Sequence, residues 1–460
     1  MKGEIDLSAE EMRAMGYRVI DVLVEHLSTL RDQPVGAKGD PAELLARFSG
    51  PAPEEGASFD SLIEIVQTHV LANTMHVNQP RFFAYVPGPS NFVSVLADAL
   101  ATGFNVFAGT WVSGSGAAAV ELETIGWLKS LCGMADTAGG LFVSGGTMAN
   151  LTGLAVARQV KLGEHDARAV VYCSDQVHSA IHKSLRLLGF FPEQVRVLRS
   201  DDQFRLPLGD LVNAIEKDRT KGKRPFCIVA TAGTTNTGAI DPLAELAKFA
   251  QSRNLWLHVD GAYGAAAVIC DRGKSLLEGL GEADSLSLDP HKWLFQPFET
   301  GCVLVKRAAE LTGTFRVLPE YLKDTHAING QINLTDYGLQ LTRSFRALKL
   351  WMSIRYFGLA AFRAAVEHGF ELAEFTESHI RRMDGWEIVT PAQMGVVCFR
   401  HKGRDEAFHL KLVQRVIEDG YTLITSTNLR GVTSLRMCLI NPSTTEDDII
   451  RSLGRLDELV

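Results

Sequence analysis

The sequence lacks the cysteine spacing of a disulfide-bonded or zinc-binding protein. Its seven cysteines are scattered along the chain, and no two of them form a CxxC pair. This odd, dispersed set indicates reduced thiols in a cytoplasmic protein rather than a disulfide framework or a zinc site. The cysteines are Cys132, Cys173, Cys227, Cys270, Cys302, Cys398 and Cys438.

The chain also has no basic run and no long hydrophobic run. Its 46 basic and 54 acidic residues give a formal net charge of -8, so we expect neither nucleic acid nor an anionic membrane as a partner. The longest apolar stretch, GAYGAAAVIC at 261–270, is too short to cross a bilayer. The first residues mix acids with apolar side chains, unlike a signal peptide, and a soluble protein is expected.

The first of three regions, residues 1–90, has the pattern of a helical segment with a Pro/Gly-rich connection. Ser8 and Glu11 have the spacing of a capping box, and apolar residues recur at helical spacing after them. Such a helix must bury its apolar face in its own domain or on a second subunit. We favour a second subunit, because residues 34–56 resemble an extended strap.

The second region, about 91–360, alternates β-branched runs with helical stretches. Runs such as AVVYCS, FCIVATAG, LWLHVD and GCVLVK are mostly separated by enough residues for a helix. This alternation predicts βαβ units, an α/β fold and a mostly parallel sheet. A long helical stretch at 344–383 and shorter alternating elements follow, and they predict a small C-terminal α+β domain over 361–460.

A glycine-rich turn, SGGTMAN, follows the strand-like LFV. Gly145, Gly146 and Thr147 stand where a strand runs into a helix, a place where backbone N–H groups and the helix dipole favour an anion. The pattern is neither GxGxxG nor the P-loop spacing, which makes a nicotinamide-binding protein improbable. The turn is either a phosphate cradle or simply a tight connection.

Three further residues follow predicted strands. His178 suits either a helix cap or a flat ring stacked on a planar ligand. Asp260, after LWLHV, is either a salt-bridge or capping residue or the partner of a protonated heterocyclic nitrogen. Lys292, in DPHKWL, is either a solvated charge or an amine made nucleophilic by burial, which disfavours the ammonium form.

Together these residues match one molecule, pyridoxal 5′-phosphate (PLP). A phosphate cradle, a stacking imidazole, a carboxylate for a ring nitrogen and an amine for an aldehyde correspond to its groups in turn. The motifs SGGTMAN, DQVHSA, ATAGTTNTGAIDPL, HVDGAYG and DPHKWL resemble those of the PLP-dependent decarboxylases related to aromatic-L-amino-acid and glutamate decarboxylases. The resemblance implies an aspartate-aminotransferase-like fold and a homodimer whose active sites lie at the subunit interface.

By the same resemblance, each residue would have a role toward the cofactor. Lys292 would form the internal aldimine, Asp260 would pair with the pyridinium nitrogen, and His178 would stack on one ring face. Asp289 takes a position where relatives carry asparagine near the phosphate, and a second anion there would repel it. The remaining cofactor-binding residues would be Gly145, Gly146, Thr147, Thr235, Ala262 and His291.

Residues 316–343 form a long polar stretch without periodicity, typical of a lid. Tyr337 matches the loop tyrosine that, in the family, is expected to protonate the quinonoid carbon across the interface. Relatives with phenylalanine there favour aldehyde-forming chemistry, so tyrosine indicates simple decarboxylation. The alternative is a tyrosine that only pins the loop.

The substrate is expected to be an aromatic L-amino acid: tryptophan, tyrosine, phenylalanine or DOPA. No fixed cation for a distal carboxylate is evident near the FFAY segment, as a glutamate enzyme would need. A decarboxylase of glutamate or 2,4-diaminobutyrate type and an aldehyde synthase remain the alternatives. Candidate substrate-contacting residues are Tyr85, Pro87, Phe107 and Trp111.

Overall fold

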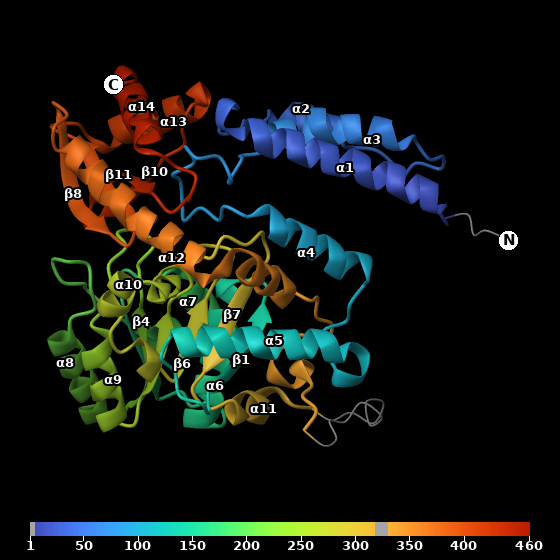
Figure 1. Ribbon diagram of the computed structural model, residues 1–460. Coiled ribbons are helices and arrows are strands. Elements are labelled where there is room, and N and C mark those ends of the chain that lie inside the picture. The colour runs from blue at the N-terminus through green and yellow to red at the C-terminus, as the bar shows by residue number, and fades with distance from the viewer. Residues whose placement is uncertain (1–4, 318–329) are drawn as a thin grey trace.

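The computed structural model describes residues 5–317 and 330–460. An N-terminal arm extends from the body of the molecule (Figure 1), formed by α1 (Ala9–Thr29), α2 (Pro41–Arg47) and α3 (Phe59–Ile65). The predicted capping box is confirmed, because the Ser8 hydroxyl accepts from the Glu11 N–H at 3.1 Å and the Glu11 carboxylate accepts from the Ser8 N–H. None of the 21 residues of α1 is buried, although its sequence is amphipathic.

A seven-stranded sheet forms the body, in the order β1-β7-β6-β5-β4-β2-β3. Neighbouring strands from β6 to β3 are parallel, and only β7 among these seven runs the other way. This confirms the predicted α/β fold with a mostly parallel sheet. The strands are β1 (Gly139–Val143), β2 (Ala169–Ser174), β3 (Val195–Leu198), β4 (Arg224–Thr231), β5 (Trp256–Asp260), β6 (Ser285–Leu288) and β7 (Gly301–Val305).

Apolar side chains fill both faces of this sheet. In β4, Ile228 and Ala230 join one hydrophobic cluster, whereas Cys227 and Val229 join the cluster on the opposite face. This alternation follows from the pleat of a strand that is covered on both sides. The helices of this region are α4 (Phe92–Gly103), α5 (Trp111–Leu131), α6 (Gly146–Leu162), α7 (Ser179–Leu187), α8 (Leu208–Thr220), α9 (Leu243–Ser252), α10 (Asp271–Leu276) and α11 (Ala309–Phe315).

The long helix α12 (Ala347–Ile380) runs from the body to a smaller C-terminal unit (Figure 1). It contacts α4 and α5 at one end and β8 and β9 at the other, and it bends at Gly358, where φ is +76°. The predicted domain division at 360 falls beside this bend. The C-terminal unit has an antiparallel sheet, order β10-β11-β9-β8, and two helices: β8 (Trp386–Gln393), β9 (Val396–His401), β10 (Thr425–Leu429), β11 (Val432–Cys438), α13 (Glu406–Asp419) and α14 (Glu446–Glu458).

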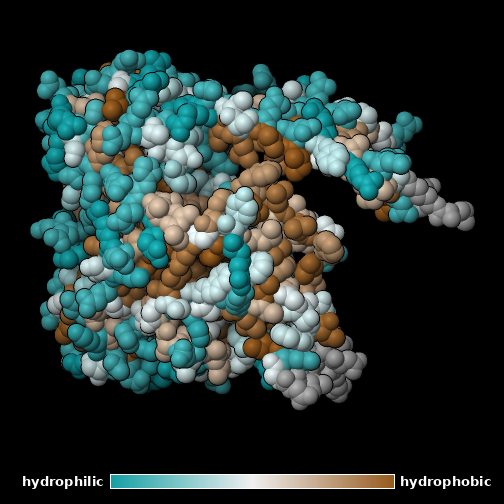
Figure 2. Space-filling view, viewed as in Figure 1, coloured by the Kyte–Doolittle hydropathy of each residue, from teal (hydrophilic) through white to brown (hydrophobic). Residues whose placement is uncertain are grey.

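Hydrophobic side chains gather on the surface where the arm meets the body (Figure 2). A groove of about 580 Å³ lies there, and its apolar lining includes Val22, Leu23, Met75 and Phe298. Within residues 5–317 and 330–460, no helix is both long and apolar enough to pass through a membrane.

Candidate active site

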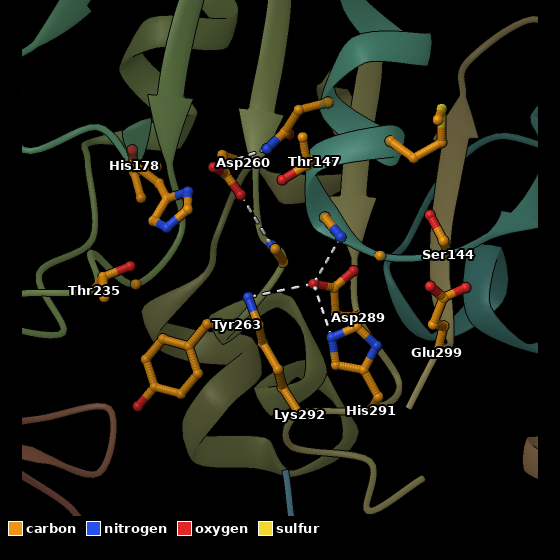
Figure 3. A pocket seen from close by; sticks show the side chains of 17 residues that line it. Ser144, Thr147, His178, Thr235, Asp260, Tyr263, Asp289, His291, Lys292 and Glu299 are labelled. Carbon is orange, nitrogen blue, oxygen red and sulfur yellow. Dashed lines mark hydrogen bonds and ion pairs between the residues drawn. The ribbon is translucent and has the colours of Figure 1, made fainter. Parts of the chain in front are cut away.

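The carboxyl ends of β1, β2, β4, β5 and β6 meet at one edge of the sheet, because these five strands run in the same direction. A cavity of about 330 Å³ opens at that edge. Figure 3 shows polar side chains from several strand ends around it, with the Lys292 amine pointing inward. All ten predicted cofactor-binding residues line this cavity: Gly145, Gly146, Thr147, His178, Thr235, Asp260, Ala262, Asp289, His291 and Lys292.

Lys292 stands on a short turn after β6 that is fixed by the core beneath it. The Lys292 N–H donates to the Asp289 carbonyl at 3.0 Å, and the next residue, Trp293, is fully buried and stacks on Tyr263 at 5.3 Å between ring centroids. The turn therefore holds the lysine stem while its amine reaches the cavity. The amine lies 3.2 Å from the Asp289 carboxylate, and the side chain is 25% exposed.

Asp260 ends β5 as a buried carboxylate with no basic side chain in hydrogen-bonding contact among the described residues. Its Oδ1 accepts from the Ala262 N–H at 3.2 Å and the Ser287 hydroxyl at 3.1 Å, and its Oδ2 accepts from the Asn150 amide at 3.1 Å. Neutral donors thus hold a negative charge at the wall of the cavity. Such a carboxylate can stabilise a positive charge on a bound ligand.

The glycine-rich turn forms the N-terminus of α6, whose first turn has no side-chain cap. A Cβ on Gly146 would lie 2.7 Å from Asp289 Oδ2 and 2.9 Å from the Ala262 Cβ, so only glycine fits this approach. The Gly146 N–H already donates to Asp289 Oδ2 at 2.9 Å, whereas Asp289 Oδ1 has no hydrogen-bond partner in the described parts of the chain. The cradle therefore combines a helix N-terminus with an acidic side chain.

Two histidines complete the wall. His178 caps α7, since its Nδ1 accepts from the Ala180 N–H at 3.2 Å, and it also lines the cavity. His291 accepts from the Thr300 N–H at 3.0 Å through Nδ1 and lies 3.5 Å from Asp289. Burial lowers the pKa of both imidazoles, so both are neutral at pH 7. His178 thus both caps α7 and lines the cavity.

The predicted substrate-contacting residues and Tyr337 are not among the side chains that line this cavity. The stretch from Phe107 to Trp111 contacts instead the segment that carries Tyr337. The Thr335 N–H donates to the Gly109 carbonyl at 3.0 Å, and the Trp111 N–H donates to the Asn333 side chain at 2.9 Å.

Tyr337 itself packs against the cluster around Leu141, and burial raises its pKa. Residues 318–329 of the predicted lid lie outside the described residues. Pro87 is buried, and Tyr85 is exposed and lines a second cavity that also includes Thr235.

Arg436, which was not among the predicted site residues, lines that second cavity of about 260 Å³. Its guanidinium is buried and donates to the Tyr85 carbonyl, but Nε and Nη2 reach no acceptor among the described residues. A buried cation with unsatisfied donors is costly unless an anion meets it. The signal was present in SLRMCLI, where an arginine interrupts an otherwise mostly apolar strand.

Comparisons with known proteins identify the family of the chain. Residues 41–402 match the family model described as the pyridoxal-dependent decarboxylase conserved domain. The chain is 44% identical to the aromatic-L-amino-acid decarboxylase of Bacillus atrophaeus, over 100% of this chain and 97% of that protein. It is 30% identical to the phenylacetaldehyde synthase of Arabidopsis thaliana, over 98% and 96% of the two chains. The crystal structure of the Oryza sativa TDC with PLP and tryptamine superposes with a TM-score of 0.93 at 27% identity, covering 98% of each chain.

Proposed function

Since the chain belongs to the pyridoxal-dependent decarboxylase family and is a PLP-dependent amino-acid decarboxylase, we propose that it converts an aromatic L-amino acid to the amine and CO2. The observation that carries the substrate class is the 44% identity over the whole chain to a relative named for aromatic amino acids. The rice structure at a TM-score of 0.93 holds tryptamine, the amine of an aromatic amino acid.

The residues around the cavity fit PLP by their chemistry. Bound PLP supplies a conjugated ring that accepts the electron pair left on the substrate's Cα when CO2 departs. Lys292 offers the amine that holds the cofactor's aldehyde, and Asp260 keeps a proton on the ring nitrogen through its negative charge. Gly145, Gly146 and Thr147 face the phosphate at the helix N-terminus, where the dipole favours an anion.

His178, Ala262, Thr235 and His291 have positioning roles in this proposal. His178 lies on the cavity wall as a neutral ring, suited to stacking on a flat heterocycle. Ala262 offers a small apolar surface for the ring's other face, and its N–H also fixes Asp260 at 3.2 Å. Thr235 and His291 line the same cavity and would help to position the cofactor.

We assign the substrate's α-carboxylate to Arg436. This guanidinium is buried with two unsatisfied donor atoms, and its cavity shares Thr235 with the cavity of Lys292. The positive charge of the guanidinium beside this cavity would attract a carboxylate bound there. If Arg436 instead binds a distal carboxylate, the enzyme will prefer glutamate, and the substrate screen below distinguishes the two cases.

We propose further that the active protein is a homodimer with shared active sites. The exposed apolar residues of α1, including Met12, Tyr17 and Val24, need a partner surface, and so does the groove beside Phe298. The segment with Phe107, Trp111 and Tyr337 would then reach the partner's cavity, where Tyr337 delivers a proton to the substrate's Cα. Tyr85 and Pro87 would border the same substrate space.

A substrate screen tests this proposal. The purified protein with added PLP is incubated with each of the twenty amino acids and with DOPA, and CO2, amine, aldehyde and peroxide are measured. We expect amine and CO2 in equal amounts from one or more aromatic amino acids. Preference for glutamate or 2,4-diaminobutyrate would overturn the aromatic assignment. Aldehyde with stoichiometric peroxide would make the protein an aldehyde synthase instead.

A further inference from the structure

A row of buried polar side chains starts at the Asp260 carboxylate and continues into the core between α6 and the sheet. Asn150 donates to Asp260 Oδ2 at 3.1 Å, and its own amide oxygen lies 2.9 Å from His258 Nε2. His258 Nδ1 is 2.8 Å from the Ser285 hydroxyl, which also accepts from the Trp256 indole N–H at 2.8 Å. The row therefore links five residues through four successive hydrogen bonds.

The chemistry of the end groups fixes the direction of every bond in the row. The indole of Trp256 can only donate, so the Ser285 oxygen accepts there and its own proton is free for His258 Nδ1. The Asn150 amide oxygen can only accept, so His258 must carry its proton on Nε2. In each hydrogen bond, consequently, the donor lies on the side away from Asp260 and the acceptor on the side toward it. The row keeps His258 as the neutral tautomer with its proton on Nε2.

Burial makes this arrangement a specific one rather than a chance set of contacts. Asn150, Trp256, His258 and Ser285 are all at most 1% exposed, and each has hydrogen-bond partners. Polar groups in a core are costly unless all of them are paired, and apolar residues of similar size would fill the same space.

Gly153 of α6 shows how closely the helix lies on the imidazole. A Cβ at this position would be 2.9 Å from His258 Cε1 and 3.0 Å from its Nδ1. Glycine inside a helix is less favourable than alanine, and here it lets α6 pack directly on the ring. Helix α6, whose N-terminus forms the phosphate cradle, thus packs on His258, the histidine linked through Asn150 to Asp260.

We infer that Trp256, Ser285, His258 and Asn150 are positioning residues that orient the Asp260 carboxylate toward the cofactor's ring nitrogen. Asn150 restrains one carboxylate oxygen, while Ser287 and the Ala262 N–H restrain the other. A fixed carboxylate keeps its charge aimed at the protonated nitrogen and needs no reorientation during turnover. This inference rests on the role proposed for Asp260.

The test compares His258→Leu with His258→Gln in holoenzyme reconstituted with ¹⁵N-labelled PLP. Leucine ends the row, whereas a glutamine amide can donate to Asn150 and accept from Ser285. We expect His258→Leu to lower kcat by about tenfold or more with KM changed less than about threefold, and His258→Gln to recover most of that loss. The ring-nitrogen ¹⁵N resonance should move toward the unprotonated position in His258→Leu and return in His258→Gln.

Tyr172→Phe is the matched control, because it removes one buried hydrogen bond, 2.8 Å to Asp218, from β2 of the same sheet, and Tyr172 does not line the cavity. Its ¹⁵N resonance and kcat should stay at the wild-type values. A wild-type resonance and kcat in folded His258→Leu would overturn the inference. An equal decrease in kcat in His258→Leu and His258→Gln would also overturn it. If His258→Leu does not fold, Ser285→Ala must show the same direction of change, and an unchanged resonance there overturns it.

Asp260→Ala separates this inference from the proposal beneath it. If Asp260→Ala leaves the ring nitrogen protonated and kcat unchanged, the role proposed for Asp260 fails. The other outcome is that Asp260→Ala loses both ring-nitrogen protonation and kcat while the His258 variants keep the wild-type values. In that case only the positioning role inferred for the row is wrong.

Discussion

The Lys292 amine and the Asp289 carboxylate lie 3.2 Å apart, so the amine proposed to hold the cofactor is paired with an acid at the phosphate cradle. The same carboxylate oxygen accepts from the Gly146 N–H at 2.9 Å. A bound phosphate would therefore share its cradle with a second anion. Electrostatic repulsion between the two should weaken cofactor binding.

Asp289→Asn should therefore bind PLP more tightly, because the amide removes the negative charge and keeps a similar shape. We expect the Kd for PLP at pH 7.5 to fall by about threefold to tenfold in titrations of the apoprotein. Weaker binding in Asp289→Asn would mean that pairing with Lys292 matters more than repulsion. Lys292→Ala is the reference variant, and it should lose the visible absorption of lysine-bound cofactor altogether.

Arg436→Met should raise KM for the amino acid by about tenfold or more, since the substrate's carboxylate would lose the charged partner proposed for it. The methionine side chain keeps much of the apolar bulk, so folding should survive. Arg436→Lys retains the positive charge but not the forked guanidinium, so its KM should lie between those of the wild type and Arg436→Met. KM is measured by steady-state kinetics on the best aromatic substrate. An unchanged KM in Arg436→Met would show that Arg436 does not bind the substrate's carboxylate.

Tyr337→Phe should shift the product from amine toward aldehyde, because the phenol proposed to protonate Cα is lost. Burial raises the pKa of Tyr337, so the hydroxyl keeps its proton at pH 7 and can donate it. Amine and aldehyde are quantified together from a single reaction. If the product ratio stays as in the wild type, Tyr337 only secures the 333–343 segment, and another group delivers the proton.

Much of the site could be predicted from the sequence because its signals are local. Asp260 follows the strongly apolar run LWLHV, and Lys292 follows SLSL, in which serine and leucine alternate; both patterns are typical of strands. The direction of the strands then places their carboxyl ends together. The two alternatives for His178 could not be separated from sequence, since one side chain both caps α7 and lines the cavity.

Contacts between distant segments could not be predicted. The Trp111 N–H meets the Asn333 side chain across 222 residues of sequence, and no local pattern at either position indicates this contact. Arg436 lies in the C-terminal unit, far in sequence from the motifs that identified the cofactor. Its position beside Tyr85 follows only from the packing of that unit on the body.

The buried His258 predicts a specific dependence of stability on pH. Burial lowers the pKa of His258 from its ordinary value of 6.5 to about 4, so between these values the unfolded chain binds more protons than the folded one. The contribution of neutral His258 to stability should therefore be fully present above about pH 6.5 and fall as the pH drops toward 4.

Urea midpoints at pH 7.5 and 5.0 measure the effect, and His258→Gln is the comparison because its side chain cannot titrate. We expect the wild type to lose more stability than His258→Gln over this interval. Equal losses would show that His258 is not buried as a neutral ring, and the direction of donation toward Asp260 would then be wrong.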